Sequence, residues 1–188
     1  MRIFLNIQKA FNTTAEELDA IKNTAKIASI RKNDFFLREG EISTSVAFIE
    51  QGSMRLFYNA KEKEVCNDFF FENSVIGSFG SFMAQTPSLV NIAAIENCEL
   101  VIFKHEDVMA LIEQYTTIKR LSDIIIQEQF LRSEKREASL LRLNPEERFK
   151  NLLEEHPKIF KRIPLRHVAS YLNITPETLS RYRAKFSV

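Results

Sequence analysis

The last quarter of the chain, residues 163–186, limits the possible folds more than any other stretch. Three apolar residues share one face of a short helix there: Leu165, Val168 and Leu172. Ala169 beside them leaves room for a second helix to cross closely. Asn173 then tolerates the left-handed backbone conformation in which helices often end, and Ile174 fills the corner. The pattern predicts a helix that stops at a tight turn.

A second helix is expected directly after this turn. Thr175 is its expected N-cap, and Pro176 takes the first helical position, where its missing N–H has no cost. Leu179 and Phe186 are spaced to face the first helix, with Tyr182 near them. The outward side is polar and basic: Thr178, Arg181, Arg183 and Lys185. This helix-turn-helix suits a DNA major groove, although paired helices also occur in helical domains that bind no DNA.

Charge is unevenly distributed along the chain. Residues 158–188 carry seven Lys and Arg side chains and one Glu, a net charge of +6, whereas the whole chain has a formal net charge of +1. The remainder is therefore slightly acidic. A basic terminal domain on an acidic body is typical of proteins that bind the phosphate backbone of nucleic acids.

Composition allows one medium domain or two small ones. The chain has 188 residues, 45% of them hydrophobic, which suffices for a sizeable core. It has no run of about eighteen apolar residues, so we expect no membrane-spanning helix. Residues 1–10 lack the small-residue cleavage motif of a signal peptide. We therefore expect a cytoplasmic protein with no membrane partner.

The cysteines and histidines point to no metal chemistry. Cys66 and Cys98 lie far apart inside apolar, strand-like runs, which predicts buried free thiols in a reducing compartment. Two cysteines are too few for an iron–sulfur cluster, which usually needs about four ligands. The three histidines have no metal-binding spacing: His105, His156 and His167. We expect no metal and no cofactor.

The middle of the chain changes from helical to strand-like patterning. A capping box at Thr14 and Glu17 begins a helix that we expect to run to about Ile27. From Ser29 onward, short runs rich in Phe, Ile and Val are separated by turn residues, which predicts an antiparallel sandwich or barrel. The expected strands include a hairpin and two further segments: 46–49 with 53–58, 65–71 and 98–103.

Two helices are expected next, at 106–115 and 117–141. Ile118, Leu121 and Ile125 form a stripe at coiled-coil spacing on the long one. Another apolar set lies on a different side: Ile124, Leu131 and Ala138. A helix that is apolar on two sides needs two partners, which we expect to be the β domain and the same helix of a second subunit. Burial within a single chain is the alternative. Asn144 and the Pro after it then predict the start of another helix.

Several stretches together resemble one protein family: 36–41 (FLREGE), 47–52 (AFIEQG), 75–82 (VIGSFGSF), 144–153 (NPEERFKNLL) and 163–185, which contains ASYLNITPETLSR at 169–181. They resemble the Crp/Fnr family of bacterial transcription regulators, and the last resembles one branch of it. The resemblance covers nearly the whole chain. It implies an α+β fold with an N-terminal antiparallel, jelly-roll-like β-roll of the cyclic-nucleotide-binding type, a long dimerisation helix and a helix-turn-helix. The implied domains are 1–116, 117–142 and 143–188.

The resemblance also implies an effector pocket, formed by six residues: Gly77, Ser78, Phe79, Gly80, Ser88 and Leu89. Members that bind a cyclic nucleotide use a Glu for the ribose hydroxyl and an Arg for the phosphate. Ser78 stands in place of the Glu, and Ser88 or Leu89 in place of the Arg. Residues 75–94 contain no charged side chain. Because burying a phosphate without a cation is costly, we expect no tight binding of cyclic AMP.

Position by position, the resemblance makes Glu177, Thr178 and Arg181 the residues that face the bases. Glu177 would accept from cytosine or serve as a partner of the helix dipole. The candidates for phosphate contacts are Thr175, Ser180, Arg183 and Lys185. Pro176 stands where many members have a base-reading Arg, and the sequence after Phe186 is too short for a two-stranded wing. A homodimer would place two half-sites about one DNA turn apart and would act with RNA polymerase.

Two other functions compete with this hypothesis. A ligand-binding module without DNA binding would explain the β-roll but would leave the basic terminal helices without a role. An enzyme on the same architecture, such as a cupin-like oxygenase, usually needs clustered histidines on its strands. None of the histidines lies within residues 46–103. We therefore expect a sequence-specific DNA-binding transcription regulator and not an enzyme.

Overall fold

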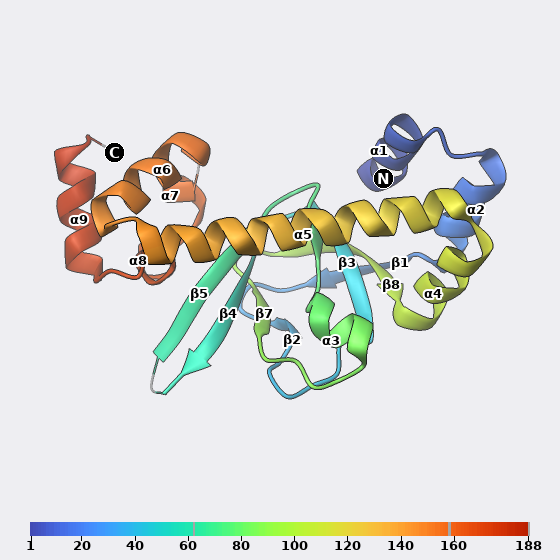
Figure 1. The fold of residues 1–188 in the computed structure, drawn as a ribbon, viewed down its shortest axis with the longest axis horizontal. Helices are drawn as coiled ribbons and strands as arrows, with labels where there is room; N and C mark the ends of the chain where they lie inside the picture. The colour runs from blue at the N-terminus through green and yellow to red at the C-terminus, as the bar shows by residue number, and fades with distance from the viewer. Residues whose placement is uncertain (62, 158, 188) are drawn as a thin grey trace. The chain divides into compact units, whose positions relative to one another are not determined.

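The computed structural model describes residues 1–61, 63–157 and 159–187. The chain forms two compact units, one made of Met1–Leu56 with Phe69–Gln129 and the other of Phe57–Asp68 with Phe130–Val188 (Figure 1). Three elements contribute residues to both units, and their bounds are β4 (Met54–Ala60), β5 (Lys63–Phe70) and α5 (Thr116–Arg142).

The strands form two four-stranded sheets. The first sheet has the order β1 (Lys26–Ile30), β8 (Cys98–Lys104), β3 (Ser45–Gln51) and β6 (Val75–Ile76). Its neighbouring strands pair antiparallel throughout. The second sheet has the order β2 (Phe35–Leu37), β7 (Asn91–Ala94), β4 and β5. The antiparallel β-roll predicted from the sequence is therefore confirmed.

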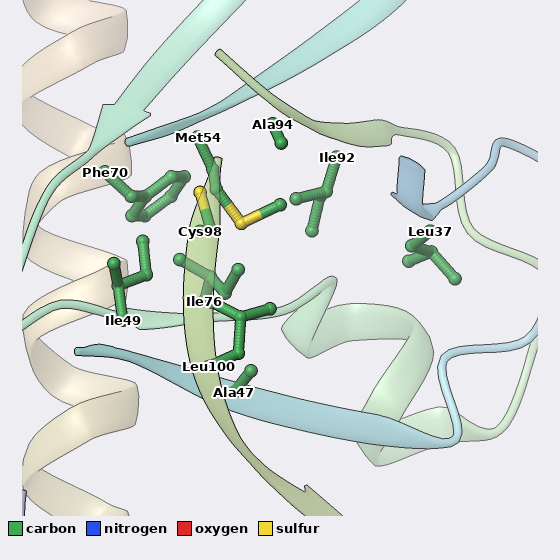
Figure 2. Close-up of a cluster of buried hydrophobic side chains, with 10 residues drawn as sticks. All are labelled: Leu37, Ala47, Ile49, Met54, Phe70, Ile76, Ile92, Ala94, Cys98 and Leu100. Carbon is green, nitrogen blue, oxygen red and sulfur yellow. The ribbon is translucent and has the colours of Figure 1, made fainter. Parts of the chain in front are cut away.

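Strand β3 shows why the first sheet lies in the interior. Successive side chains of a strand point to opposite faces, and in β3 both faces are covered. Ala47 and Ile49 belong to the core between the sheets, and both are fully buried. Phe48 belongs to a second core on the other face and is also buried. Figure 2 shows the core between the sheets, with its ten buried residues: Leu37, Ala47, Ile49, Met54, Phe70, Ile76, Ile92, Ala94, Cys98 and Leu100.

Helices cover the outer face of the first sheet: α1 (Arg2–Phe11), α2 (Ala15–Thr24), α4 (His105–Gln114) and the beginning of α5. Their apolar faces contribute Ile3, Ile7, Ile21, Leu111 and Ile118 to the second core. The Thr14–Glu17 capping box begins α2, as predicted. Helix α1 was not predicted; its first turn is held by the Glu50 carboxylate, which accepts from the backbone N–H groups of Arg2 and Ile3 at 3.0 and 3.2 Å.

Two local predictions were wrong. The helix expected to reach Ile27 ends at Thr24, and β1 begins at Lys26, where pairing with β8 outweighs helical propensity. The hairpin expected at 46–58 does not form, because β3 and β4 belong to different sheets. Gly52 carries the chain from one sheet to the other with a φ of +100°. A turn at a Gly is equally compatible with a hairpin and with a change of sheet, so the local sequence could not separate them.

The second unit contains short helices packed beside the end of α5: α6 (Pro145–Glu155), α7 (Ile159–Arg162), α8 (Leu165–Leu172) and α9 (Pro176–Lys185). Asn144 caps α6 with a complete capping box, and Pro145 occupies its first turn, as the sequence predicted. Helix α7 was not predicted. The cysteines are buried free thiols, as expected.

Gly52 offers a direct test of the turn between the sheets. A Cβ at this position would lie 2.6 Å from the Asn97 carbonyl oxygen and 2.7 Å from Cys98 Sγ. We predict that Gly52→Ala lowers the free energy of unfolding by more than about 1 kcal/mol in urea denaturation. Gly40→Ala is the matched control, because Gly40 also has a positive φ of +87° but nothing within 4 Å of its Cβ position. Equal losses in the two variants would contradict the steric account.

Candidate nucleic-acid interface and effector site

Helices α8 and α9 form the predicted helix-turn-helix. Asn173 ends α8 in the left-handed conformation, with φ 51° and ψ 49°. Thr175 caps α9 by accepting a hydrogen bond from the Thr178 N–H at 3.3 Å. Leu172 and Leu179 are fully buried between the helices. Within the first helix the prediction fails at Leu165, which stays 36% exposed at the start of α8 instead of joining the buried face.

An aromatic cluster fixes α9 within the second unit. The ring of Phe149 on α6 is fully buried, and its centroid lies 5.4 Å from that of Phe160, 5.5 Å from that of Tyr182 and 5.6 Å from that of Phe186. Such contacts add stabilisation beyond simple burial of area. Because Tyr182 and Phe186 belong to α9 and its C-cap, the cluster determines which side of α9 faces outward.

Arg148 is a supporting residue that the sequence analysis missed. Its buried guanidinium donates from Nε to the Leu172 carbonyl at 3.0 Å and from Nη1 to the Leu143 carbonyl at 2.6 Å. It thereby satisfies carbonyl groups at the ends of α8 and α5, which helices leave without intrahelical partners. The sequence around Arg148 gave no sign of this role, because its two carbonyl partners belong to other helix ends.

The outward side of α9 carries a chain of polar contacts. The Thr175 hydroxyl lies 3.3 Å from the Thr178 hydroxyl, and Arg181 Nη2 donates to that hydroxyl at 3.1 Å. Arg181 is exposed and Thr178 is half-buried. The three side chains therefore line one side of α9, with the Arg181 guanidinium oriented by its neighbour. Ser180 is exposed beside them.

Glu177 lies in the first turn of α9, exposed to solvent. Hydrogen bonds from its own backbone N–H and from the Thr175 side chain hold the pKa of its carboxyl below the usual value. The carboxylate is thus ionised and turned back toward the helix N-terminus, where a negative charge is favourable. This arrangement matches the helix-dipole role considered from the sequence and leaves contact with a cytosine as a proposal.

The two basic residues at the end of α9 are less free than the sequence suggested. Lys185 Nζ pairs with the Glu146 carboxylate of α6 at 2.9 Å, and Lys150 pairs with the same carboxylate at 3.2 Å. These two hydrogen bonds lower the pKa of Glu146. Arg183 was expected to point outward, but it is half-buried, and its Nε is buried with no hydrogen-bond partner among the described residues. Its spacing of four residues places it beside the buried Leu179 on α9.

The predicted effector residues lie around α3 (Phe79–Ala84) and the loop after it. Ser88 is 2% exposed, and its hydroxyl donates to Ser78 Oγ at 3.0 Å or to the Val90 carbonyl at 2.9 Å, while it accepts from the Val90 N–H at 3.1 Å. Its polar groups are thus satisfied within the chain. Ser78 and Ser88 are brought together, whereas Leu89 is 76% exposed and takes no part.

The backbone of Ser88 is paired with the loop that contains Gly40 and Glu41. The Gly40 N–H donates to the Ser88 carbonyl, and the Ser88 N–H donates to the Glu41 carbonyl, both at 2.8 Å. The Glu41 carboxylate lies in the same loop and accepts from the Arg38 N–H at 2.8 Å. Gly77 is buried against Val46, whose Cγ1 would lie 2.9 Å from a Cβ, whereas Gly80 is exposed, with open space around it.

The predicted dimer stripe packs largely on its own subunit. Ile118 is 7% exposed and belongs to the core under α1 and α4, and Leu121 packs against the same core. Ile125, together with both of them and Phe79, lines an apolar cavity of about 400 Å³ in the first unit. Leu121 and Ile125 are half-buried, and the contact of this stripe with a second subunit stays a prediction. Apolar residues remain exposed elsewhere on α5: Phe130, Leu131, Leu140 and Leu141.

The described part of the chain has no group of three or more His, Cys, Asp and Glu side chains that could hold a metal ion. Its helices include none with the length and hydropathy needed to cross a membrane.

Comparison with known proteins agrees with this architecture. Residues 27–115 match the family model described as the cyclic nucleotide-binding domain. A comparison of the sequence with curated proteins finds no match.

Among solved structures, FixK2 from Bradyrhizobium japonicum matches with a TM-score of 0.77 and 17% identity over 87% of this chain and 84% of that chain. The c-di-GMP-responsive global regulator CLP of Xanthomonas campestris matches with a TM-score of 0.74 and 15% identity, over 93% of this chain and 92% of that chain. A protein from Eubacterium rectale that is described as a putative transcriptional regulator of the Crp/Fnr family matches with a TM-score of 0.70 and 15% identity, over 94% of this chain and 84% of that chain. The chain thus shares the fold of Crp/Fnr regulators.

Proposed function

We propose that this protein is a Crp/Fnr-type transcription regulator that binds specific DNA sites as a homodimer, with α9 as its recognition helix. The observation that carries the proposal is the outward side of α9, where Arg181 is exposed and oriented by Thr178. The shared fold with regulators of this class supports it. Its action at promoters together with RNA polymerase belongs to the same proposal.

Arg181 and Glu177 are the proposed base-reading residues, with Thr178 between them. An Arg guanidinium can donate two hydrogen bonds to guanine, and a carboxylate can accept from cytosine N4. Thr175, Ser180 and Lys185 are proposed to contact phosphates, which set position and not sequence. Arg183 can join them only if its half-buried side chain turns outward. Pro176 leaves the first position of the helix without a side-chain donor.

Dimerisation is proposed to use the side of α5 opposite Ile118. Leu131 is 54% exposed and Leu141 is 77% exposed, and Ile124 and Ala138 lie seven residues to either side of Leu131. Residues seven apart on a helix share one side, so Ile124, Leu131 and Ala138 could pack against the same helix of a second subunit, with Leu141 three residues beyond Ala138 at the neighbouring seam position. A single ten-residue recognition helix binds weakly, and two of them in one dimer raise affinity through multivalency.

The β-roll is proposed not to bind cyclic AMP tightly. Ser88 or Leu89 stands in the place of the phosphate-binding Arg; the Ser88 hydroxyl is fully used within the chain, and Leu89 offers no polar group. If the β-roll has an effector, its chemistry differs from that of a cyclic nucleotide.

The role of Arg181 can be tested on duplexes selected from a random pool by the wild-type protein. Arg181→Ala is predicted to lose about tenfold or more of the discrimination between selected and scrambled duplexes, because a base contact is removed. Lys185→Ala should weaken binding to both duplexes equally, and it should reduce the salt dependence of the binding constant by about one phosphate contact. Glu146→Gln is the matched control, because it releases Lys185 from its ion pair and should strengthen binding to both duplexes. Unchanged discrimination in Arg181→Ala would exclude this docking.

The dimer surface makes a separate prediction. Leu131→Asp places a charge in the centre of the proposed surface and should convert the dimer into a monomer in sedimentation equilibrium at micromolar concentrations. Ser133→Asp adds the same charge two residues away, on an exposed position outside the surface, and should leave the dimer intact. A dimer that persists in Leu131→Asp would show that subunits associate elsewhere.

Nucleotide binding can be measured by titration calorimetry of the full chain. Cyclic AMP and cyclic GMP are both expected to give no binding in the micromolar range, since no cation is present in residues 75–94 to pair with the phosphate. Micromolar affinity for either nucleotide would refute the assignment of Ser88.

A further inference from the structure

The β4–β5 hairpin contacts the first helix of the helix-turn-helix through one serine. Ser170 of α8 donates from its hydroxyl to the Glu64 carbonyl at 3.0 Å, and the same oxygen accepts from the Cys66 N–H at 2.9 Å. Both partners are backbone groups of β5, more than a hundred residues away in the sequence. One side chain thus uses its donor and an acceptor lone pair on a single strand.

The position of β5 explains why this contact matters. β5 is the last strand in the order of the second sheet. An edge strand presents backbone N–H and C=O groups that lack a neighbouring strand. Ser170 satisfies two of them, so α8 takes the place of a further strand at this point. Cys66 is consequently fully buried, with its Sγ 3.9 Å from His167 Nδ1 of α8.

Two contacts from α5 complete what we call the hairpin junction, made of Glu64, Cys66, Asp68, Arg132, Arg136, His167, Ser170 and Tyr171. Arg132 Nε pairs with the Asp68 carboxylate of β5 at 2.6 Å. The Arg136 guanidinium carbon lies 3.8 Å from the centroid of the Tyr171 ring, and its Nη2 donates to the Tyr171 carbonyl. Both side chains are half-buried, and this burial lowers the pKa of Arg136 and raises that of Tyr171.

The junction leaves the recognition helix uncovered. It uses the side of α8 that carries His167, Ser170 and Tyr171, whereas Ser180 and Arg181 of α9 remain exposed. Docking of the hairpin is therefore compatible with DNA contact through α9. The strands of this hairpin continue into the β-roll, so a change in the β-roll that moves β4 or β5 acts directly on the junction.

We propose that the β4–β5 hairpin is a latch on the helix-turn-helix, held closed by the two hydrogen bonds of the Ser170 hydroxyl to β5. The docked hairpin holds α8 and α9 in the arrangement that binds DNA, and its release lowers DNA affinity. What the latch controls rests on the proposed DNA-binding function, whereas the latch itself is a property of the chain alone. Ser170 is a positioning residue, because it acts through β5 and touches no base or phosphate.

Cys66 is a natural probe of the latch. Its thiol is buried beneath α8, so alkylation requires the hairpin to open. Cys98 lies in the core between the sheets and is 2% exposed, so its alkylation reports unfolding of the β-roll. The rates at both thiols can be followed in the unmodified full chain by mass spectrometry of the two peptides after treatment with iodoacetamide.

Ser170→Ala should raise the Cys66 rate about tenfold and leave the Cys98 rate unchanged, because two backbone groups of β5 lose their partner. Ser170→Thr keeps the hydroxyl and should stay close to wild type. Ser133→Ala removes an exposed hydroxyl of α5 and should have no effect. An unchanged Cys66 rate in Ser170→Ala, or equal increases at both thiols, would overturn the latch.

The link to DNA is tested with a duplex selected by the wild-type protein. Saturating duplex should slow Cys66 alkylation, and Ser170→Ala should weaken duplex binding about tenfold, because coupling between two equilibria is reciprocal. If the wild-type protein binds and Ser170→Ala binds equally well, the control of DNA affinity by the latch is excluded. If no duplex binds the wild-type protein, the proposed function fails, and the effect of Ser170→Ala on Cys66 still decides whether the latch exists.

Discussion

The placement of α9 depends on the aromatic cluster around Phe149. A helix of ten residues is marginal in water by itself, because the cost of forming its first turn is repaid only over a longer helix. Phe149 supplies the missing stabilisation by packing against Tyr182 and Phe186. The same contacts fix the rotation of α9 about its axis, which turns Arg181 outward and Arg183 inward. Base recognition, the phosphate contacts and the hairpin junction all assume this arrangement.

Residues with a strong local meaning made the second unit predictable. Asn173 in a left-handed conformation, Thr175 as a cap and the Asn144 capping box each act within a few residues of the chain, and each was found as predicted. The predictions failed where distant partners decide the outcome. Lys26 and Ile27 leave the expected helix because β8 is available as a partner strand, and Gly52 connects two sheets and not two strands of a hairpin.

The same distinction applies to the site. The spacing of Thr175, Thr178 and Arg181 could be interpreted from the sequence, because residues three apart meet on a helix. The ion pair that holds Lys185 depends on Glu146 of α6, and the burial of Arg183 depends on packing that its own helix does not determine, so neither could be predicted. Ser170 looked like an ordinary position inside the motif, because its partners Glu64 and Cys66 lie on a strand far away in the chain. The periodicity of α5 could not tell which of its apolar sides faces its own sheet, and the structure places Ile118 and Leu121 at the core under α1 and α4.

In the proposed complex, two copies of α9 read a two-fold symmetric DNA site. Hydroxyl-radical footprinting of the wild-type protein on a duplex selected from a random pool tests this arrangement. Two protected segments related by a two-fold axis are expected, with their centres about 10 base pairs apart on one side of the duplex. A single protected segment, or a selection that yields no sequence preference, would contradict it.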